Sequence, residues 1–270
     1  MKRLVVNADD FGFTRGVNAG IVEAYRDGIL TAATLMANGA AFDDAVRLAR
    51  ENPSLDIGCH LVLVGGPSVL DPSRDLPATM SELVRVVASR RIRIYDELAS
   101  QVRRILAAGV APTHLDTHKH THLLPPVLSA VARIGEAFGI PWVRRPFDFP
   151  MQPGRAPWMK RAVSQSFGLV RGQFHRMLTR HACRTTDHFA GFQITGRYGP
   201  AELAALIRAL PEGTTEFMCH PGRCGEDLRM ARTRLKESRE EELRALVSAE
   251  VRSAVSEAGV DLVSYRDLNG

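Results

Sequence analysis

Short apolar runs alternate with amphipathic stretches along almost the whole chain. The amphipathic stretches repeat their apolar residues every three to four positions, as helices do, and the shorter runs are rich in β-branched residues, as buried strands are. Strands are predicted at 4–8, 31–36, 56–64, 113–116, 142–144, 215–218 and 260–263, and helices at 14–27, 41–50, 81–88, 96–108, 126–138, 158–183, 200–210 and 236–257. This alternation predicts an α/β fold in which helices cover a parallel sheet. For 270 residues we expect a single domain, residues 1–270, built as a (β/α) barrel.

Polar residues stand where several of the predicted strands end. Asp9 and Asp10 follow the first strand, His60 lies late in the third, a histidine-rich segment follows the fourth, and His220 follows the strand at 215–218. The carboxyl ends of barrel strands converge on one face, so residues far apart in sequence become neighbours there. One Asp with two His forms a suitable shell for a divalent metal ion that keeps open positions. A second Asp is then free to act as a base, and another His as an acid.

The histidine-rich segment 114–122 reads His-Leu-Asp-Thr-His-Lys-His-Thr-His. As a helix it would place three of its histidines on one face, and as a strand it would align all of them with Asp116. Pro112 before the segment and Pro125 and Pro126 after it leave little room for a long helix. A short strand, a loop and a new helix are therefore predicted. The alternative is a solvated loop that binds metal adventitiously.

Simpler structural roles are open for the other polar residues. An acidic pair such as Asp9 and Asp10 often forms the first turn of a helix, but Thr14 is the better cap for the helix that follows, which leaves the pair free to face a site. A lone histidine in an apolar strand is more often a core residue, and at His60 the two interpretations carry about equal weight. After His220, a Pro-Gly pair forces a turn directly after the strand.

Two irregular segments are expected to be loop insertions, near residues 65–80 and 145–157. The first is long enough to be a lid or a substrate-binding loop. The second holds four prolines together with aromatic residues, which suits contact with a sugar ring. Burial of a loop edge explains those aromatic residues equally well.

Composition narrows the class of protein. The hydrophobic fraction of 45% is ordinary for a globular protein, and no apolar run approaches the roughly 20 residues of a membrane-spanning helix. The four cysteines lack paired spacing, so no disulfide framework is predicted. The first residues turn acidic too early for a signal peptide. We expect a cytoplasmic protein, with peripheral membrane contact left open.

The chain is basic, with a formal net charge of +5 and a pI near 9.3. Such a balance permits a nucleic-acid, anionic-lipid or acidic-substrate partner and identifies none of them. Much of the excess lies in arginine-rich patches, at 85–93 and 144–184, that are interleaved with apolar residues. We interpret these patches as solvated helix faces, and no nucleic-acid partner is expected.

Four motifs, in order along the chain, resemble those of the YdjC-like carbohydrate deacetylases. That family includes chito-oligosaccharide deacetylases and hopanoid-biosynthesis-associated deacetylases. The motifs are Asn7-Ala8-Asp9-Asp10-Phe11-Gly12, Gly58-Cys59-His60-Leu61, the run from Thr113 to His122, and Glu216-Phe217-Met218-Cys219-His220-Pro221. Within the third motif this chain has Thr117 and Lys119, where the family often has Ser and a further His.

The resemblance implies a distorted (β/α) barrel related to the polysaccharide deacetylase (NodB-like) fold. It also implies metal-dependent hydrolysis of an N-acetyl group from an N-acetylglucosamine-type sugar. Asp10, His60 and His118 would then bind one divalent metal ion, Mg or Zn by preference, with Mn, Co and Ni also compatible with such ligands. Asp9 is similar to the family's proposed general base, and His220 is the candidate general acid.

Further residues are expected to orient a metal ligand or to bind the substrate. Asp116 would accept a hydrogen bond from a ligand histidine, and a backbone N–H near Phe11 would help the metal to stabilise an oxyanion. The full set expected in these roles is Phe11, Asn38, Asp116, His120, His122, Arg145 and Asp187. For His114, His120 and His122, pocket-lining and structural roles have equal weight.

Other interpretations of the same residues stay open. One is a phosphoesterase, which a site for two metal ions would distinguish. Another is a metal-dependent sugar-binding protein without turnover, although binding alone needs neither a base nor an acid. The acetylated sugar itself is left open between a chito-oligosaccharide, a lipid-linked glucosamine and a glycolipid, and a homodimer is expected on frequency alone.

Overall fold

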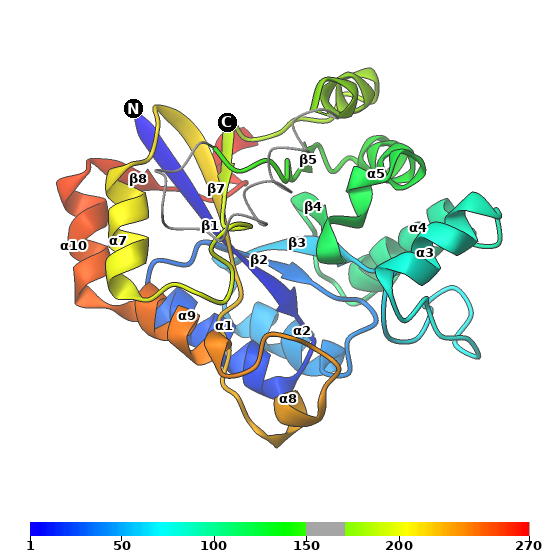
Figure 1. Cartoon of the computed structure of the whole chain (residues 1–270), viewed down its shortest axis with the longest axis horizontal. Helices are drawn as coiled ribbons and strands as arrows, with labels where there is room; N and C mark the ends of the chain where they lie inside the picture. The colour runs from blue at the N-terminus through cyan, green and yellow to red at the C-terminus, as the bar shows by residue number, and fades with distance from the viewer. Residues whose placement is uncertain (150–170, 270) are drawn as a thin grey trace.

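The computed structural model describes residues 1–149 and 171–269, and its centre is a curled sheet of eight strands that pair in parallel (Figure 1). The strands follow the order β5-β4-β3-β2-β1-β7-β6, and β8 pairs with the first residues of β1. They are β1 (Lys2–Phe11), β2 (Ala32–Leu35), β3 (Asp56–Leu61), β4 (His114–Thr117), β5 (Trp142–Val143), β6 (His188–Ala190), β7 (Gly213–Cys219) and β8 (Val260–Leu262). The central strand, β1, is apolar and buried over most of its length, as strands covered on both faces are.

Helices cover the outside of the sheet (Figure 1). Thr14 caps α1 as predicted, because its hydroxyl accepts a hydrogen bond from the backbone N–H of Val17. The helices are α1 (Arg15–Asp27), α2 (Phe42–Glu51), α3 (Met80–Ala88), α4 (Ile94–Ala107), α5 (Pro125–Phe138), α7 (Pro200–Arg208), α8 (Glu226–Met230), α9 (Ser238–Val247) and α10 (Ala249–Glu257), with short 3-10 helices η1 (His118–Leu123) and η2 (Asp267–Asn269). Residues 171–180 are also helical.

The sheet curls into a half-barrel, and isolated bridges link its two edges. Trp142 bridges to Arg184, and Asp148 bridges to Phe189 in β6. The expected α/β architecture with a parallel, barrel-like sheet is therefore confirmed in this half-barrel form. All the carboxyl ends of the strands face one side of the molecule, which is where ligand sites form in such sheets.

The structure differs from the predicted elements at 236–257 and at β6. The stretch 236–257 is two helices, because Ser248 has an extended backbone (φ −71°, ψ 145°) and its hydroxyl caps α10 at the N–H of Val251. The short strand β6 was not predicted, since three residues are too few to show a pattern. The predicted helix at 158–183 and the insertion at 145–157 fall partly outside the described residues.

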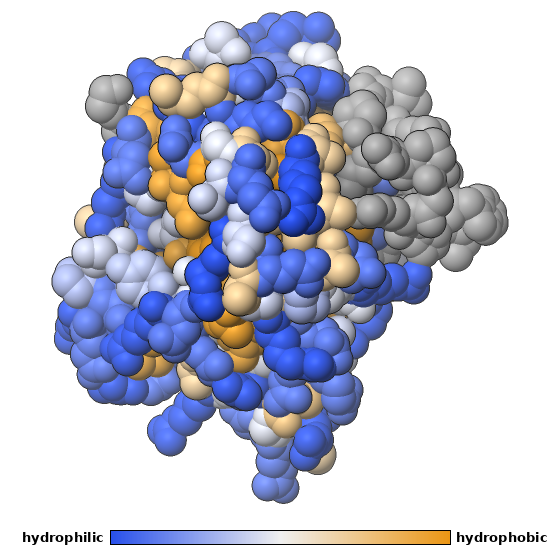
Figure 2. Space-filling model, turned by 90° about the vertical axis from the view of Figure 1, so that its left-hand side faces the viewer, coloured by the Kyte–Doolittle hydropathy of each residue, from blue (hydrophilic) through white to orange (hydrophobic). Residues whose placement is uncertain are grey.

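The outer surface is polar. On the side that carries α7 and α10, hydrophilic residues cover most of the face, and hydrophobic residues show in narrow strips between them (Figure 2). Among the described residues, none of the helices combines the length and the apolar character needed to cross a bilayer.

Candidate active site

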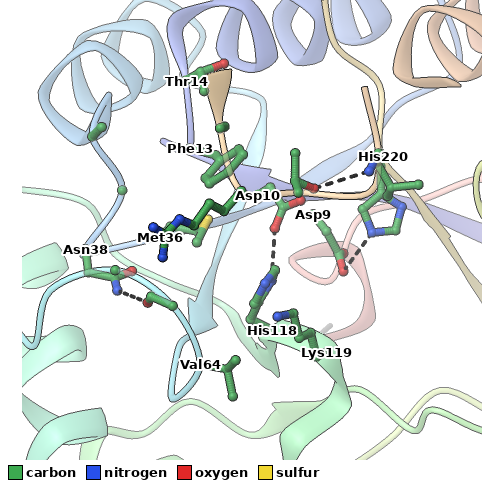
Figure 3. Close-up of a pocket in the computed structure, with 18 of the residues that line it drawn as sticks. Asp9, Asp10, Phe13, Thr14, Met36, Asn38, Val64, His118, Lys119 and His220 are labelled. Atoms are coloured by element: carbon green, nitrogen blue, oxygen red, sulfur yellow. Dashed lines mark hydrogen bonds and ion pairs between the residues drawn. The ribbon is translucent and has the colours of Figure 1, made fainter. Parts of the chain in front are cut away.

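Asp9 and Asp10 serve two different clusters, because the backbone leaves the extended conformation between them. Asp10 has φ 68°, in the left-handed region that Asp tolerates better than most residues, and Gly12 follows with φ 95°. The close-up shows the carboxylate of Asp10 turned toward His118 and that of Asp9 turned toward His220 (Figure 3). Both side chains are nearly fully buried.

Three atoms, from Asp10, His60 and His118, converge on one point at the carboxyl ends of β1, β3 and β4. Asp10 Oδ1 lies 3.3 Å from His60 Nε2 and 3.3 Å from His118 Nδ1, and the two nitrogens are 3.2 Å apart. Metal–ligand bonds of about 2.0–2.1 Å place neighbouring ligands of a tetrahedral ion roughly 3.3 Å apart. Asp10 Oδ1 is buried and has no hydrogen-bond partner in the described structure. The three residues thus fit a divalent metal ion.

The surroundings of His60 favour a positive charge at this point. Burial lowers the pKa of His60, but the carboxylates of Asp116 and Asp10 outweigh it and raise the pKa to about 10. Burial likewise raises the pKa of Asp10, yet Arg239 and the two histidines hold it well below its usual value. A cation shared by these groups would therefore be stabilised by ionised carboxylates on more than one side.

Asp116 holds His60 in the orientation that a metal ligand needs. Its Oδ1 lies 2.7 Å from His60 Nδ1, and its Oδ2 accepts a hydrogen bond of 3.0 Å from the hydroxyl of Thr34. A proton on Nδ1 leaves the lone pair of Nε2 directed at the convergence point. This is the contact expected for Asp116.

Arg144 joins the carboxylates beneath the site into one network. Its guanidinium donates to both oxygens of Asp9, at 2.8 and 2.7 Å, and lies 2.7 Å from Asp116 Oδ2 and from Glu216 Oε1. All four side chains are buried. Burial lowers the pKa of Arg144, but the three carboxylates hold it well above its usual value.

His220 lies between two carboxylates. Its Nε2 is 3.8 Å from Asp9 Oδ2 and its Nδ1 is 3.9 Å from Glu242 Oε2. The backbone N–H of His220 donates to the same Glu242 oxygen at 2.6 Å. Burial lowers the pKa of His220 to about 4, against the opposing effect of Asp9 and Asp10, so its imidazole is neutral near pH 7.

The remaining histidines of the 114–122 segment have separate roles. His114 Nε2 donates to Asn7 Oδ1 at 2.9 Å and the ring stacks on Tyr265, and His122 Nε2 lies 3.1 Å from the backbone oxygen of Arg144. Both positions are structural. His120 lines the cavity, and its buried Nδ1 lacks a hydrogen-bond partner within the described part of the chain.

A cavity of about 1010 Å³ opens above the convergence point. Its wall includes Asp9, Asp10, His118 and His220 at the carboxyl ends of the strands, together with parts of the loop 65–78 and of the segment 231–235. Lys119 also faces it (Figure 3). The volume suits a ligand of the size of one or two sugar rings.

Two polar side chains hold the loop 65–78 at the cavity. Asn38 Nδ2 donates to the backbone oxygens of Gly65 and Pro67, at 3.2 and 3.1 Å. Glu97, buried on α4, accepts hydrogen bonds from the backbone N–H groups of residues 69 and 70 and from the hydroxyl of residue 68. Asn38 Oδ1 is buried without a partner in the described structure and lies on the cavity wall.

Three residues expected in the site lie elsewhere. The side chain of Phe11 is fully buried in the core and does not line the cavity. Arg145 donates to the backbone oxygen of Asp187, and neither lines the cavity. Asp187 precedes β6 and accepts from the N–H of Thr214 near the start of β7, so it lies at the opposite end of the parallel strands. For Asp187, the sequence pattern did not reveal which end of the strand it occupies.

Three buried residues of the site were not predicted, namely Arg144, Arg239 and Glu242. The interpretation of the arginine-rich patches as solvated faces is wrong for Arg144, which is 1% exposed. Arg239 is equally buried and donates to Asp10 Oδ2. The adjacent pair Asp9 and Asp10 was a usable signal for such residues. Two buried carboxylates require cationic partners unless the metal alone balances their charge.

Comparison with known proteins agrees with this geometry. A family model described as "YdjC-like protein" matches residues 3–257. The chain is 33% identical to a carbohydrate deacetylase of Brevibacillus brevis over 277 aligned residues, covering 98% of this chain and 99% of the relative. It is also 33% identical to a chitooligosaccharide deacetylase of Klebsiella pneumoniae over 271 residues, covering 98% of each.

Solved structures share the fold at lower sequence identity. A protein from Enterococcus faecalis, described as a candidate cellobiose-phosphate cleavage protein, superposes with a TM-score of 0.77 at 22% identity, covering 99% of this chain and 98% of that one. A lactam utilization protein from Thermus thermophilus superposes with a TM-score of 0.53 at 17% identity, covering 98% of this chain and 100% of that one. With the family model matching nearly the whole chain and relatives at 33% identity over almost its full length, this protein belongs to the YdjC-like family.

Proposed function

We propose that this protein is a metal-dependent carbohydrate deacetylase that removes the N-acetyl group from an N-acetylglucosamine-type sugar, in an oligosaccharide or a glycolipid. The observation that carries the proposal is the convergence of one atom each from Asp10, His60 and His118, within 3.3 Å of one another, next to a sugar-sized cavity that Asp10 and His118 line. The deacetylase names of the relatives from Brevibacillus and Klebsiella support it.

One divalent ion, Mg or Zn by preference, would be held by Asp10, His60 and His118. When bound, such an ion lowers the pKa of water and polarises a carbonyl group. Asp116 keeps His60 oriented for this purpose, and Arg239 occupies the other oxygen of Asp10, so that Oδ1 is the oxygen free to act as a ligand.

Asp9 acts as the general base. The two hydrogen bonds from Arg144 fix its carboxylate beside the convergence point, where it accepts a proton from the attacking water. His220 is neutral before the reaction, so the proton that it delivers to the leaving amine is released during the reaction itself. Asp9 Oδ2, at 3.8 Å from His220 Nε2, is close enough to pass that proton on after a small movement, and Glu242 stabilises the transient imidazolium.

A phosphoesterase with two metal ions is less consistent with the site. Within the described residues, the other group that could hold an ion consists of Asp9, His60 and Asp116. It shares His60 with the first group, and Arg144 already occupies its two carboxylates. A second cation at that position would displace or repel the buried guanidinium.

Acetate release from diacetylchitobiose and from an N-acetylglucosaminyl lipid tests the proposal, with metal-stripped protein and single divalent ions added back. We expect release that depends on the added ion from at least one of the two substrates. No release from either, while the protein still binds the ion, would contradict the deacetylase function.

Three variants test the assigned roles. We expect His118→Ala to lose both the ion and turnover, whereas His120→Ala, a matched change two residues away, retains the ion. Asp9→Asn should lower kcat by about 10²-fold or more without loss of the ion, as removal of a general base does. Turnover within a few-fold of the wild type in Asp9→Asn would refute its role as the base.

A further inference from the structure

The backbone next to Phe11 has few donors left for a substrate. The N–H of Gly12 donates to Asn18 Oδ1 at 2.7 Å, and the N–H of Phe13 donates to the backbone oxygen of Asp10 at 3.0 Å. Both hydrogen bonds hold the turn that carries Asp10 into α1. These two N–H groups are therefore not free to serve as the oxyanion donor that was expected here.

Arg239 offers such a donor from a different part of the chain. It lies at the start of α9, is 1% exposed and lines the cavity. Its Nε donates to the backbone oxygen of Leu235 at 3.2 Å, and its Nη2 donates to Asp10 Oδ2. Its Nη1 is buried and has no hydrogen-bond partner among residues 1–149 and 171–269.

A purely structural role for Arg239 leaves this nitrogen unexplained. A buried N–H group without a partner destabilises the folded state, and more so when the group is charged. A shorter cation such as Lys could neutralise Asp10 without carrying a second donor nitrogen. Arg, by contrast, has a planar fork whose two terminal nitrogens lie side by side, so that when Nη2 holds Asp10, Nη1 lies next to it.

Resting on the proposed function, we infer that Arg239 Nη1 donates a hydrogen bond to the acetamide oxygen of the substrate as that oxygen becomes negatively charged. In this step, a bond forms between the water oxygen and the carbonyl carbon, and the C=O π electrons move to the oxygen. The electrons then return as the C–N bond breaks, the amine nitrogen takes its proton from His220, and acetate leaves. Arg239 thus both positions Asp10 and stabilises the oxyanion.

The arrangement suits this task electrostatically. The guanidinium is already oriented by two hydrogen bonds, to Asp10 and to Leu235, so no reorganisation is needed when the charge develops. It is shielded from water, which strengthens its interaction with a new anion. Its charge is in part neutralised by Asp10 in the resting state, while Nη1 has no hydrogen-bond partner among the described residues of a side chain that lines the cavity.

The test compares Arg239→Gln and Arg239→Lys with the wild type, with Arg244→Gln as the matched control. Arg244 is on the same helix but is exposed and pairs with Glu241. Measurements are kcat and KM for acetate release at saturating metal, the affinity for Zn²⁺ by calorimetry, and thermal unfolding. We expect kcat to fall about 10²–10³-fold in Arg239→Gln, as on removal of one oxyanion donor, with KM within about threefold of the wild type.

Arg239→Lys separates the two roles, because Lys keeps the charge beside Asp10. We expect its Zn²⁺ affinity to stay within about tenfold of the wild type while kcat still falls more than about tenfold. Recovery of wild-type kcat at high metal concentration in either variant would overturn the inference, since Arg239 would then act through Asp10 alone. If the wild type is active and Arg239→Gln is equally active, the inference about Arg239 is also overturned. If the wild type releases no acetate, the proposed function itself is refuted, and the role of Arg239 with it.

Discussion

Replacing Arg144 with Met is the sharpest test of the buried network. Arg144→Met removes the guanidinium that lies 2.7–2.8 Å from Asp9, Asp116 and Glu216 and puts a side chain of similar length in its place. All three carboxylates are at most 3% exposed, so water cannot replace the lost partner without rearrangement. The variant would thus leave three buried carboxylates with no shared cation.

The expected loss is large on the scale of a folded protein. Breaking a buried ion pair by removing one partner costs about 3–5 kcal/mol, against a total stability of about 5–15 kcal/mol for a typical domain. The loss should depend on pH. In the wild type, burial raises the pKa of Asp116, but Arg144 and His60 outweigh it and hold the pKa below its usual value.

The sign of the pH effect follows from this shift. With its pKa depressed in the folded state, Asp116 contributes stability above the unfolded pKa of about 4 and loses it as the pH falls through the folded pKa. Without Arg144, burial raises the folded pKa of Asp116 and Glu216, so these two carboxylates take up protons in mild acid and the penalty shrinks. We expect Arg144→Met to lose about 3–5 kcal/mol at pH 8 and clearly less at pH 5.

Urea unfolding at pH 8 and pH 5 measures both values. Arg145→Met is the matched control, because Arg145 is also buried but donates to a backbone oxygen rather than to a carboxylate. Its loss should differ little between the two pH values. A loss for Arg144→Met below about 1 kcal/mol, or one that is equal at both pH values, would refute the buried-charge reasoning.

Three further outcomes are expected. Asp116→Asn should weaken metal binding about 10–100-fold, because His60 loses the carboxylate that orients it, and unchanged affinity by calorimetry would contradict this role. Burial lowers the pKa of His122 to about 4 and that of His114 to about 3. The unfolded chain therefore binds more protons below pH 6.5, so the free energy of unfolding should fall as the pH drops from 6.5 toward 4, by up to about 1.4 kcal/mol per pH unit for each histidine. In His122→Gln the free energy of unfolding should fall less steeply as the pH drops. The same steepness in the variant and the wild type would contradict this prediction. Glu97→Gln should raise KM about tenfold with little change in kcat, because one of the two oxygens that accept from the loop N–H groups becomes an NH2 donor. Steady-state kinetics showing a wild-type KM would rule this out.

The parts of the fold that depend on local pattern could be read from the sequence. The apolar run of β1 and the cap at Thr14 are local signals, and both place Asp9 and Asp10 at the end of the central strand. Parallel strands then bring His60 to the same face, whatever the distance along the chain.

The two buried arginines of the site, Arg144 and Arg239, could not be predicted from local sequence patterns. Arg144 meets Asp9 across 135 positions and Arg239 meets Asp10 across 229, and nothing local separates these arginines from the exposed ones around them. Whether an arginine is buried is decided by a carboxylate elsewhere in the fold. Likewise, Asp187 was expected near the site, and the pairing of β6 with β7 places it at a strand entrance instead.

The central position of β1 has a consequence for how the protein is made. Lys2 pairs with Gly213 on one side and with Val260 on the other, so the first strand emerges from the ribosome more than 200 residues ahead of these partners. At translation rates of about 5–20 residues per second, that delay is roughly 10–40 s. Over this interval residues 2–5 lack both of these neighbours, and an unpaired stretch of strand of this kind is a template for aggregation. The hydrogen bond from Arg239 to Asp10 likewise cannot form until residue 239 has been made, so this end of β1 also waits for a distant part of the chain.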